Sequence, residues 1–382
     1  MSNKVPQIRF NGYSDPWVQR KFADFIDVKS GKDYKHLNSG SIPVYGTGGY
    51  MLSVDRALSD IDAIGIGRKG TIDKPYLLKA PFWTVDTLFY AVPKQNIDLQ
   101  FSLSIFKKIN WKKLDESTGV PSLSKTVINS VSVAVPSYEE QQKIGSFFKE
   151  LDDTIALHQR KLDLLKEQKK GYLQKMFPKN GAKVPELRFA GFADDWEERK
   201  LQEVLRERNN QQPQSMEYPL VSFTVENGVT PKTDRYEREQ LVVGDKSSKK
   251  YKVTVLNDIV YNPANLKFGA ISRNKYGNAV FSPIYITFLV NNDVTTPEFI
   301  EMFVTRNDFI KRALKYQQGT VYERQSVSPT DLLAMNVYLP GKSEQEKIGS
   351  FFQQLDETIA LHQRKLDLLT EQKKGYLQKM FV

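Results

Sequence analysis

The chain of 382 residues has no cysteine and only three histidines. The lack of cysteine excludes disulfide bonds, thiolate metal ligands and a cysteine nucleophile, and it is typical of proteins from a reducing cytosol. Two of the histidines, His158 and His362, occupy the same position of a repeated segment described below. The third, His36, stands alone, so we expect neither a histidine-based metal site nor a catalytic triad.

Long apolar runs are also missing. The sequence has no stretch of the roughly 18 apolar residues that a membrane-spanning helix needs, and its first residues, MSNKVPQIRF, lack the apolar core of a signal peptide. We therefore expect a cytoplasmic protein that does not contact a membrane. Apolar residues make up 40 % of the chain, enough for packed cores, and the length is typical of two or three domains.

Acidic residues are scarce in the first half only. Residues 1–183 carry 28 Lys and Arg against 19 Asp and Glu, a net charge of +9, while residues 184–382 carry 27 against 26, a net charge of +1. A basic excess favours binding of a polyanion, most often nucleic acid. If both halves bind the same kind of ligand, the second half must concentrate its positive charge locally.

Convincing catalytic motifs are missing as well. Gly65–Gly70 matches the G-x-G-x-x-G pattern of dinucleotide-binding proteins, but Pro75 follows too soon for the helix that this motif requires. A glycine loop that displays Arg68 and Lys69 is better suited to approaching a phosphate backbone. The segment Asn262–Asn265 lacks the second proline and the aromatic residue of an amino-methyltransferase motif. These absences predict a binding protein without catalytic activity.

The main feature that is present is a segment of 35 residues that occurs twice. Residues 143–177 and 347–381 differ at four positions, at a constant offset of 204 residues. Apolar residues recur at alternating spacings of three and four, which is a coiled-coil heptad pattern and predicts helices of roughly 50–60 Å. We expect the two helices to pair antiparallel; the alternative is that each packs only on its own domain. The residues predicted to pair the helices are Ile144, Phe148, Leu151, Ile155, His158, Leu162, Leu165, Tyr172, Ile348, Phe352, Leu355, Ile359, His362, Leu366, Leu369 and Tyr376.

Some residues of this helix do not fit a simple apolar seam. His158 and His362 interrupt it near each midpoint, where a polar residue commonly sets the register of a coiled coil. Leu157, Leu164 and Leu173 lie outside it, which indicates a wider apolar face and a further helical partner.

A second duplication precedes each variable region. Residues 5–21 and 184–200 share Val-Pro, Arg-Phe, a glycine and a tryptophan at an offset of 179, and we expect Trp17 and Trp196 to be buried. The regions between the repeats show short β-rich runs with turn signals, and residues 96–115 and 295–318 are each predicted to form one helix. Thr296 is the expected N-cap of the second of these helices.

This organisation resembles the specificity subunit of type I restriction-modification systems. The resemblance rests on two variable domains, each followed by a near-identical long helix. It also rests on the similar segments that lead into these helices, Pro136–Ile144 and Pro340–Ile348. The segment IPVYGTGGY and the Ile-Gly-Arg-Lys-Gly loop are similar to segments of that family's target recognition domains. It implies an α+β fold with internal pseudo-two-fold symmetry. Its expected parts are a first target recognition domain, a first spacer helix with connector, a second recognition domain and a second spacer helix, at residues 1–138, 139–183, 184–340 and 341–382.

The same resemblance implies a function for each part. Each recognition domain would read one half of a bipartite target in double-stranded DNA. The antiparallel helices would set the spacing and dock two methyltransferase (modification) subunits. S-adenosylmethionine, ATP and magnesium would belong to partner subunits, including restriction and translocase subunits, and not to this chain. Two alternatives stay open, a coiled-coil scaffold that binds no DNA and a self-contained DNA-modifying enzyme.

Candidate DNA contacts are the polar and basic residues of the loops. Arg68 suits either a guanine edge or a phosphate, whereas the lysines suit phosphates because an ammonium group is a flexible point charge. In the first domain the candidates are Tyr45, Thr47, Arg68, Lys69, Lys74, Ser122, Ser124 and Lys125. In the second they are Lys249, Lys250, Lys252, Asn265, Lys267, Arg273, Lys275, Tyr322, Arg324 and Gln325.

Overall fold

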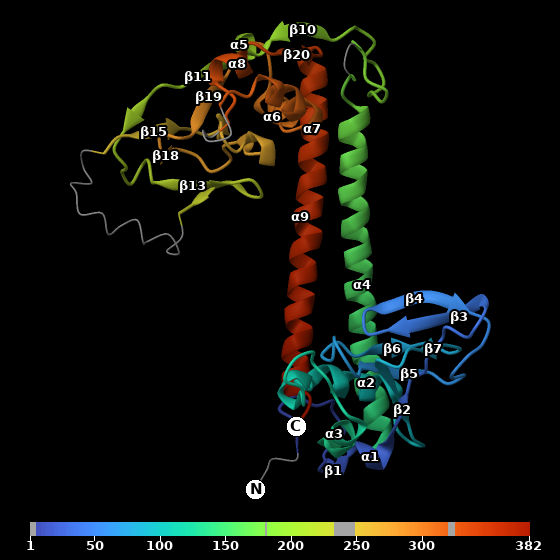
Figure 1. The fold of residues 1–382 in the computed structure, drawn as a ribbon. Helices are drawn as coiled ribbons and strands as arrows, with labels where there is room; N and C mark the ends of the chain where they lie inside the picture. Colours follow the sequence, from blue (N-terminus) through green and yellow to red (C-terminus); the bar gives the residue numbers. More distant parts are fainter. Residues whose placement is uncertain (1–4, 180–181, 233–248, 320–324) are drawn as a thin grey trace. The chain divides into compact units, whose positions relative to one another are not determined.

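A computed structural model describes residues 5–179, 182–232, 249–319 and 325–382. The chain divides into two compact units (Figure 1). The first unit contains residues 1–161 and 362–382, and the second contains residues 162–361. Two long helices, α4 (Tyr138–Lys175) and α9 (Lys342–Lys379), are each shared between the units. Among the described residues, no helix is both long and apolar enough to cross a bilayer.

The first unit is built around a four-stranded sheet in the order β2-β8-β5-β6 and a smaller sheet in the order β4-β3-β7. Strand β1 pairs with β9, the last strand before α4 begins. Its elements are β1 (Val18–Lys21), α1 (Phe22–Phe25), β2 (Ile26–Ser30), β3 (Ser39–Gly46), β4 (Gly49–Val54), β5 (Ala63–Gly67), β6 (Tyr76–Leu78), β7 (Trp83–Thr84), β8 (Leu88–Pro93), α2 (Leu99–Lys108), the 3₁₀ helix η1 (Trp111–Leu114), α3 (Lys125–Ser130) and β9 (Ser132–Val135).

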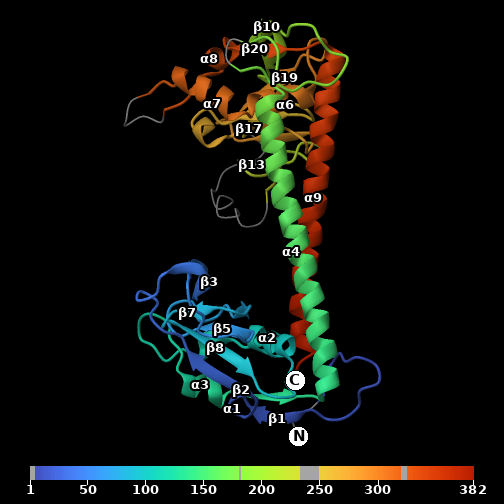
Figure 2. The ribbon, with the colours of Figure 1, turned by 90° about the vertical axis from the view of Figure 1, so that its right-hand side faces the viewer.

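Helix α2 connects the four-stranded sheet of the first unit to its long helices (Figure 2). Asp98 caps α2 by accepting a hydrogen bond from the backbone N–H of Phe101, and buried Phe101 and Ile105 lie in the same core as Ile144 of α4. Gly145 of α4 faces this cap, and a Cβ at that position would collide with Asp98. Helix α2 can therefore approach α4 this closely only because residue 145 is a glycine.

The second unit repeats this frame. Its four-stranded sheet has the order β11-β19-β16-β17, beside smaller sheets β12-β15-β18 and β13-β14, and the pair β10 with β20 leads into α9. Its elements are β10 (Glu197–Lys200), α5 (Leu201–Val204), β11 (Leu205–Glu207), β12 (Gln211–Gln212), β13 (Val221–Thr224), β14 (Gly228–Pro231), β15 (Tyr251–Thr254), β16 (Ile259–Tyr261), the 3₁₀ helix η3 (Leu266–Phe268), β17 (Ile271–Arg273), β18 (Ala279–Phe281), β19 (Ile286–Val290), α6 (Pro297–Val304), α7 (Asn307–Ala313), the 3₁₀ helix η4 (Leu314–Tyr316), α8 (Pro329–Leu333) and β20 (Asn336–Leu339).

Equivalent contacts show how closely the two frames agree. Arg9 binds Glu140 through Nε and Nη2 at 2.7 and 2.8 Å, and Arg188 binds Glu344 in the same way at 2.7 Å for both contacts. Both glutamates are buried in the first turn of a long helix. The ion pair fixes each short N-terminal motif to the helix that follows its domain, and it explains why the arginine recurs in both motifs.

The long helices run antiparallel within each unit. In the first unit Phe147 of α4 packs edge-on against Tyr376 of α9, and Asp152 forms ion pairs with Lys373 and with Lys107 of α2. In the second unit the same pairings recur between Tyr172 and Phe351 and between Lys169 and Asp356. The predicted antiparallel pairing is thus present in each unit.

The seam is apolar for most of its length. Ile144, Phe148, Leu162 and Leu165 and their repeats are buried, whereas Leu157 and Leu361 are exposed, like Leu164 and Leu368. The starts of α4 at Tyr138 and of α9 at Lys342 lie next to the predicted boundaries at residues 139 and 341.

The ends of the two helices are exchanged between the units. Phe381, just after α9, packs in the first unit against Trp17, Phe101 and Phe148, with ring centroids 6.1, 5.6 and 5.7 Å away. Phe177, just after α4, packs in the second unit against Trp196 at 5.9 Å, among others. The prediction that both tryptophans are buried is confirmed, and each lies beside the helix end of the other repeat.

Two helix predictions were wrong in extent. Residues 96–115 contain α2, which ends at Lys108, and then η1, because buried Trp111 turns back and donates its indole N–H to the carbonyl of Phe106. Residues 295–318 break between α6 and α7, where the guanidinium of Arg306 lies 4.6 Å from the ring centroid of Phe177. The N-cap at Thr296 is confirmed, since its side chain accepts from the N–H of Phe299.

The two seam histidines contact each other. The Nδ1 atoms of His158 and His362 lie 3.2 Å apart, so one ring must donate and the other accept. Replacing both by leucine should keep or raise the melting temperature, because removing both partners of a polar contact in an apolar seam leaves no unpaired group. His158→Leu alone should be less stable than the double variant, by about 1 kcal/mol. A large loss of stability in the double variant, measured by thermal unfolding, would show that the histidines have other essential partners.

Candidate nucleic-acid interface

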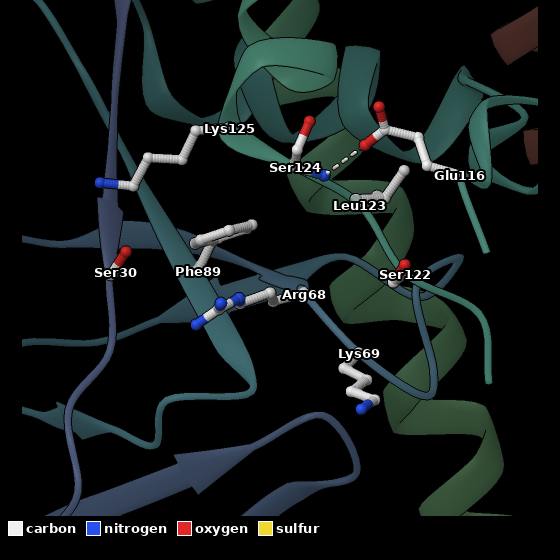
Figure 3. A pocket seen from close by; sticks show the side chains of 9 residues that line it. All are labelled: Ser30, Arg68, Lys69, Phe89, Glu116, Ser122, Leu123, Ser124 and Lys125. Atoms are coloured by element: carbon white, nitrogen blue, oxygen red, sulfur yellow. Dashed lines mark hydrogen bonds between the residues drawn. The ribbon is translucent and has the colours of Figure 1, made fainter.

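An open cavity of about 500 Å³ lies on the first unit (Figure 3). It is lined from four segments of the chain: the end of β2, the loop after β5, β8, and the loop that leads into α3. The lining residues are Ser30, Arg68, Lys69, Phe89, Glu116, Ser122, Leu123, Ser124 and Lys125. The structure therefore brings together five residues that were predicted as DNA contacts from separate loops: Arg68, Lys69, Ser122, Ser124 and Lys125.

Backbone hydrogen bonds hold the loop after β5 in place. The carbonyl of Arg68 accepts from the N–H of Leu123, and the N–H of Arg68 donates to the carbonyl of Thr87. Gly70 donates to the carbonyl of Pro121 and has a φ of +96°, a conformation that favours glycine. Strand β5 leads through this loop to β6 and not to the helix that a dinucleotide-binding motif requires.

The opposite wall is held by two acidic residues. A carboxylate oxygen of Asp115 accepts from the N–H of Ser117, the hydroxyl of Ser117 and the N–H of Ser122. These hydrogen bonds, above all the one from Ser122, hold the pKa of Asp115 below its ordinary value. The carboxylate of Glu116 accepts from the N–H of Ser124 at 3.1 Å. Glu116 is therefore engaged in shaping the wall, and it is the only acid among the described residues that line the cavity.

Cationic side chains dominate the cavity. The Arg68 guanidinium lies 5.9 Å from the ring centroid of Phe89 and makes a long contact of 3.4 Å with the carbonyl of Asp86. In Figure 3, Arg68 and Lys125 extend toward the side where Ser30 lies, on either side of Phe89, whereas Lys69 extends the other way. Three cations against one engaged carboxylate give the cavity a positive charge, which is suited to a negatively charged group.

Sequence reasoning missed four lining residues: Ser30, Phe89, Glu116 and Leu123. Ser30 and Phe89 become neighbours because β2 pairs with β8 in that register, and they are 59 positions apart in the chain. No local pattern announces that pairing. Glu116 lies shortly before the predicted contacts Ser122 and Ser124 in the sequence. Its position next to them is the sequence feature that could have indicated its role.

The remaining candidates of the first unit lie near this loop. Thr47, at the turn between β3 and β4, is close to Gly70, since a Cβ on Gly70 would lie 3.8 Å from its hydroxyl oxygen. Tyr45 packs against Tyr76, whose hydroxyl donates to the carbonyl of Gly46 at 2.6 Å. Burial raises the pKa of Tyr76, so this phenol stays protonated as a donor. Lys74 is exposed on the loop that carries Arg68.

In the second unit, some of the predicted cationic contacts are exposed, whereas others are buried in ion pairs. Lys249 and Lys250 are exposed, and Lys249 lies over the ring of Tyr251. Lys252 is only 6 % exposed, and its ammonium group donates to Glu207 at 3.0 Å and to Asn209 at 3.1 Å. Lys252 is thus placed as an internal ion pair and not as a surface contact, because its strand buries the side chain against β11.

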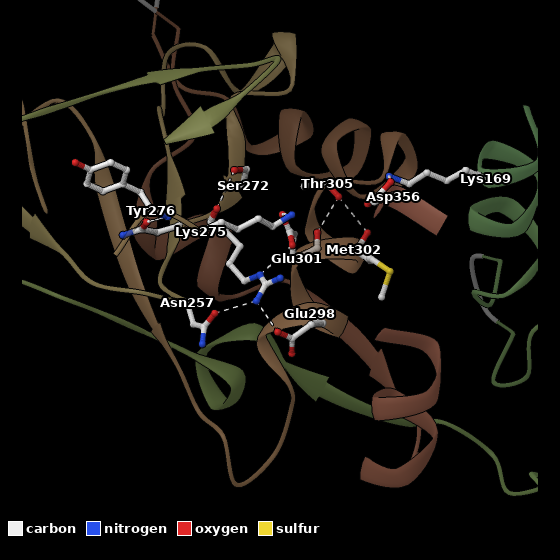
Figure 4. A network of polar contacts seen from close by, with 12 residues as sticks. Lys169, Asn257, Ser272, Lys275, Tyr276, Glu298, Glu301, Met302, Thr305 and Asp356 are labelled. Atoms are coloured by element: carbon white, nitrogen blue, oxygen red, sulfur yellow. Dashed lines mark hydrogen bonds and ion pairs between the residues drawn. The ribbon is translucent and has the colours of Figure 1, made fainter. Parts of the chain in front are cut away.

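Arg273 is also internally paired, and Figure 4 labels its partners Asn257, Glu298 and Glu301. Its guanidinium donates to Asn257, Glu298 and Glu301 at 2.9, 2.5 and 3.0 Å, and Lys275 binds Glu301 at 2.9 Å. Two carboxylates of α6 therefore balance the charge of Arg273 in this structure, and its contact with DNA stays a prediction. Asn265, Lys267 and Gln325 are exposed. Tyr322 and Arg324 lie outside the described residues.

Comparison with known proteins is consistent with this two-unit frame. The family model described as type I restriction modification DNA specificity domain matches residues 14–167 and 193–371. The chain belongs to this family of type I specificity subunits.

Individual relatives are distant. The MjaVIII specificity subunit of Methanocaldococcus jannaschii is 26 % identical over 175 residues, which cover 45 % of this chain and 37 % of that protein. The putative MjaX specificity subunit of the same organism is 21 % identical over 285 residues, covering 71 % of this chain and 62 % of that one. The chain thus aligns with less than two thirds of each relative.

Solved structures share the fold. The crystal structure of a type I restriction-modification S subunit from M. genitalium has a TM-score of 0.69 at 14 % identity and covers 99 % of both chains. A chain from a structural study of complex assembly and conformational transition in the type I R-M system has a TM-score of 0.50 at 13 % identity, covering 96 % of this chain and 98 % of that chain. At these identities the likeness shows the specificity-subunit fold alone.

The wall of the cavity in this specificity subunit should depend on Asp115. Asp115→Ala leaves the N–H groups of Ser117 and Ser122 without their acceptor, so amide hydrogen exchange across residues 115–124 should speed up. Asp115→Asn keeps one acceptor oxygen and should be intermediate. Because the folded pKa is lowered, the stabilisation is present above the ordinary pKa of a free aspartate and is lost as pH falls through the folded value. Unchanged exchange in Asp115→Ala would show that the loop is held by other contacts.

Proposed function

We propose that this specificity subunit is the DNA-reading component of a type I restriction-modification complex, with one unit for each half of a bipartite target. The observation that carries the proposal is the cationic cavity of the first unit. Its position on a rigid sheet, its loop-borne arginine and lysines, and its serine hydroxyls are the groups that proteins use on DNA backbones and base edges. The repeated frame supports a second reader of different chemistry.

The paired helices supply the second part of the proposed function. We infer that they set the spacing between the half-sites and dock two identical methyltransferase subunits. The exposed leucines support this, since each unit presents one from each helix, Leu157 with Leu368 in the first and Leu164 with Leu361 in the second. The same two exposed leucine positions in each unit suit two copies of one partner. The chemistry that needs S-adenosylmethionine, ATP and magnesium would belong to the partner subunits.

Binding to DNA separates this proposal from a scaffold that does not contact nucleic acid. The purified chain with its methyltransferase subunits should retard duplex DNA, and the affinity should fall by about 10³–10⁵ between 50 and 200 mM salt for 6–10 phosphate contacts. Mapping methylated adenines in genomes of cells with and without the subunit should reveal one bipartite motif. No retardation at low salt would favour the scaffold, and methylation by the purified chain alone would favour an enzyme.

The exchange of helix ends makes a prediction for a half-length chain. A fragment of residues 1–183 lacks Phe381, but its own Met176–Phe177 matches Met380–Phe381 in sequence. Two fragments should therefore form a dimer in which each Phe177 fills the other's core, and with methyltransferase subunits the dimer should recognise a symmetric repeat of the first half-site. Light scattering gives the oligomeric state. The fragment with Phe177→Ala is the control and should stay monomeric; a monomeric unsubstituted fragment without methylation activity would contradict the prediction.

A further inference from the structure

Backbone hydrogen bonds identify which residues occupy equal places in the two units. Leu123 N donates to the carbonyl of Arg68, and Val327 N, at the repeat offset of 204, donates to the carbonyl of Pro263. Pro263 therefore occupies the place of Arg68, and Ala264 that of Lys69. The two loops leave their sheets in the same way, and only the side chains differ.

The helix that follows each loop gives the third equivalence. Ser124 caps α3 through a hydrogen bond from Val127 N, and Ser328 caps α8 through one from Asp331 N. The first helical residue is Lys125 in one unit and Pro329 in the other. All three cations of the cavity in the first unit are thus replaced by uncharged residues in the second.

The position of Ser30, a fourth residue of the first cavity, also carries a different residue in the second unit. Ser30 ends β2, and at the offset of 179 its equivalent is Asn209, whose side-chain oxygen accepts from the ammonium of Lys252. Lys252 is itself buried and paired with Glu207. The cation that contacts Asn209 is therefore committed to an internal ion pair.

The lining of the first cavity suits a phosphate better than a base edge. Arg68 offers a planar fork of donors, Lys125 a mobile point charge, and Ser30 a hydroxyl, while the one carboxylate, Glu116, is engaged by Ser124 N. Adenine and cytosine edges present a donor in the major groove, which needs a protein acceptor, whereas guanine and thymine edges present acceptors that carry no formal charge. An excess of positive charge stabilises an anion and has no matching partner on a neutral base.

We propose that the cavity between Arg68, Lys125 and Ser30 holds a phosphate group of the DNA backbone, and that the described residues of the second unit form no equivalent phosphate site. The proposal rests on the proposed DNA-reading function, and it adds that the two units contribute differently to the binding of DNA. The first unit supplies the larger part of the charge-dependent affinity, and the second unit relies on contacts that depend less on salt.

The test measures binding as a function of salt with the full chain assembled with its methyltransferase subunits. Two duplexes are compared, one with the mapped target and one without it. Arg68→Ala and Lys125→Ala should each reduce the slope of log K against log salt concentration by about one, and they should weaken binding to both duplexes by similar factors. Lys79→Ala removes an exposed lysine of the same unit that is paired with Asp62, and its slope should match that of the unsubstituted protein.

A gain of function provides the matched experiment in the second unit. Pro329→Lys places a lysine at the equivalent first helical position and should increase the slope by about one. Thermal unfolding of each variant confirms that the fold is intact. An unchanged slope in both Arg68→Ala and Lys125→Ala, or a loss confined to the target duplex, would overturn the phosphate site; no gain in Pro329→Lys would overturn the asymmetry argument. Failure of the proposed function is distinguishable, because the unsubstituted complex would then show no preference for any sequence.

Discussion

The burial of one phenylalanine at the end of each long helix is the contact on which both units depend. Phe381 lies among Trp17, Phe101 and Phe148, and Phe177 lies among the equivalent aromatic residues of the second unit. Truncating a buried phenylalanine costs about 3–5 kcal/mol, a large share of the stability of a domain. Neither unit can complete its core from one continuous stretch of chain, so the two halves of the sequence fold as partners.

This dependence explains why the helices are nearly identical while the domains have diverged. A helix that must fit its own domain at one end and the other domain at its far end is constrained along its whole length. Gly145 and Gly349 meet the capped ends of α2 and α6, and the aspartates Asp152 and Asp356 pair with lysines of the opposite helix. The loops between the strands carry no such double constraint, and their side chains are free to differ.

The parts of the fold that repeat were predictable from the sequence, because the same pattern of residues occurs in both copies. The buried tryptophans, the antiparallel helix segments and the cap at Thr296 all came from patterns that are local or periodic. The breaks after α2 and α6 were missed because they depend on tertiary contacts of Trp111 and Arg306, which override helix propensity. Long-range packing decides such points, and no window of sequence contains it.

The candidate site was predictable only in part for the same reason. Arg68 and Lys125 were found because loops rich in glycine, serine and basic residues are recognisable, whereas Phe89 enters the site through strand register. Arg273 has the same basic character as Arg68, yet Glu298 and Glu301 bind it from a helix 25 and 28 residues later. Charge in a sequence therefore identifies possible ligands of DNA, and pairing in the fold decides which of them stay available.

The uneven charge of the two halves acquires a structural explanation from this difference. In the second unit, Arg273 and Lys252 are neutralised by acids of the same unit, and the positions equivalent to Arg68 and Lys125 are prolines. Exposed Lys267 and Phe268 lie instead on its loop after β16. A common frame can thus present a charged cavity in one unit and a largely neutral loop in the other. Phosphates are identical along DNA and bases are not, so in the proposed function one strongly charged unit would hold the duplex and the other would discriminate by shape and base contacts.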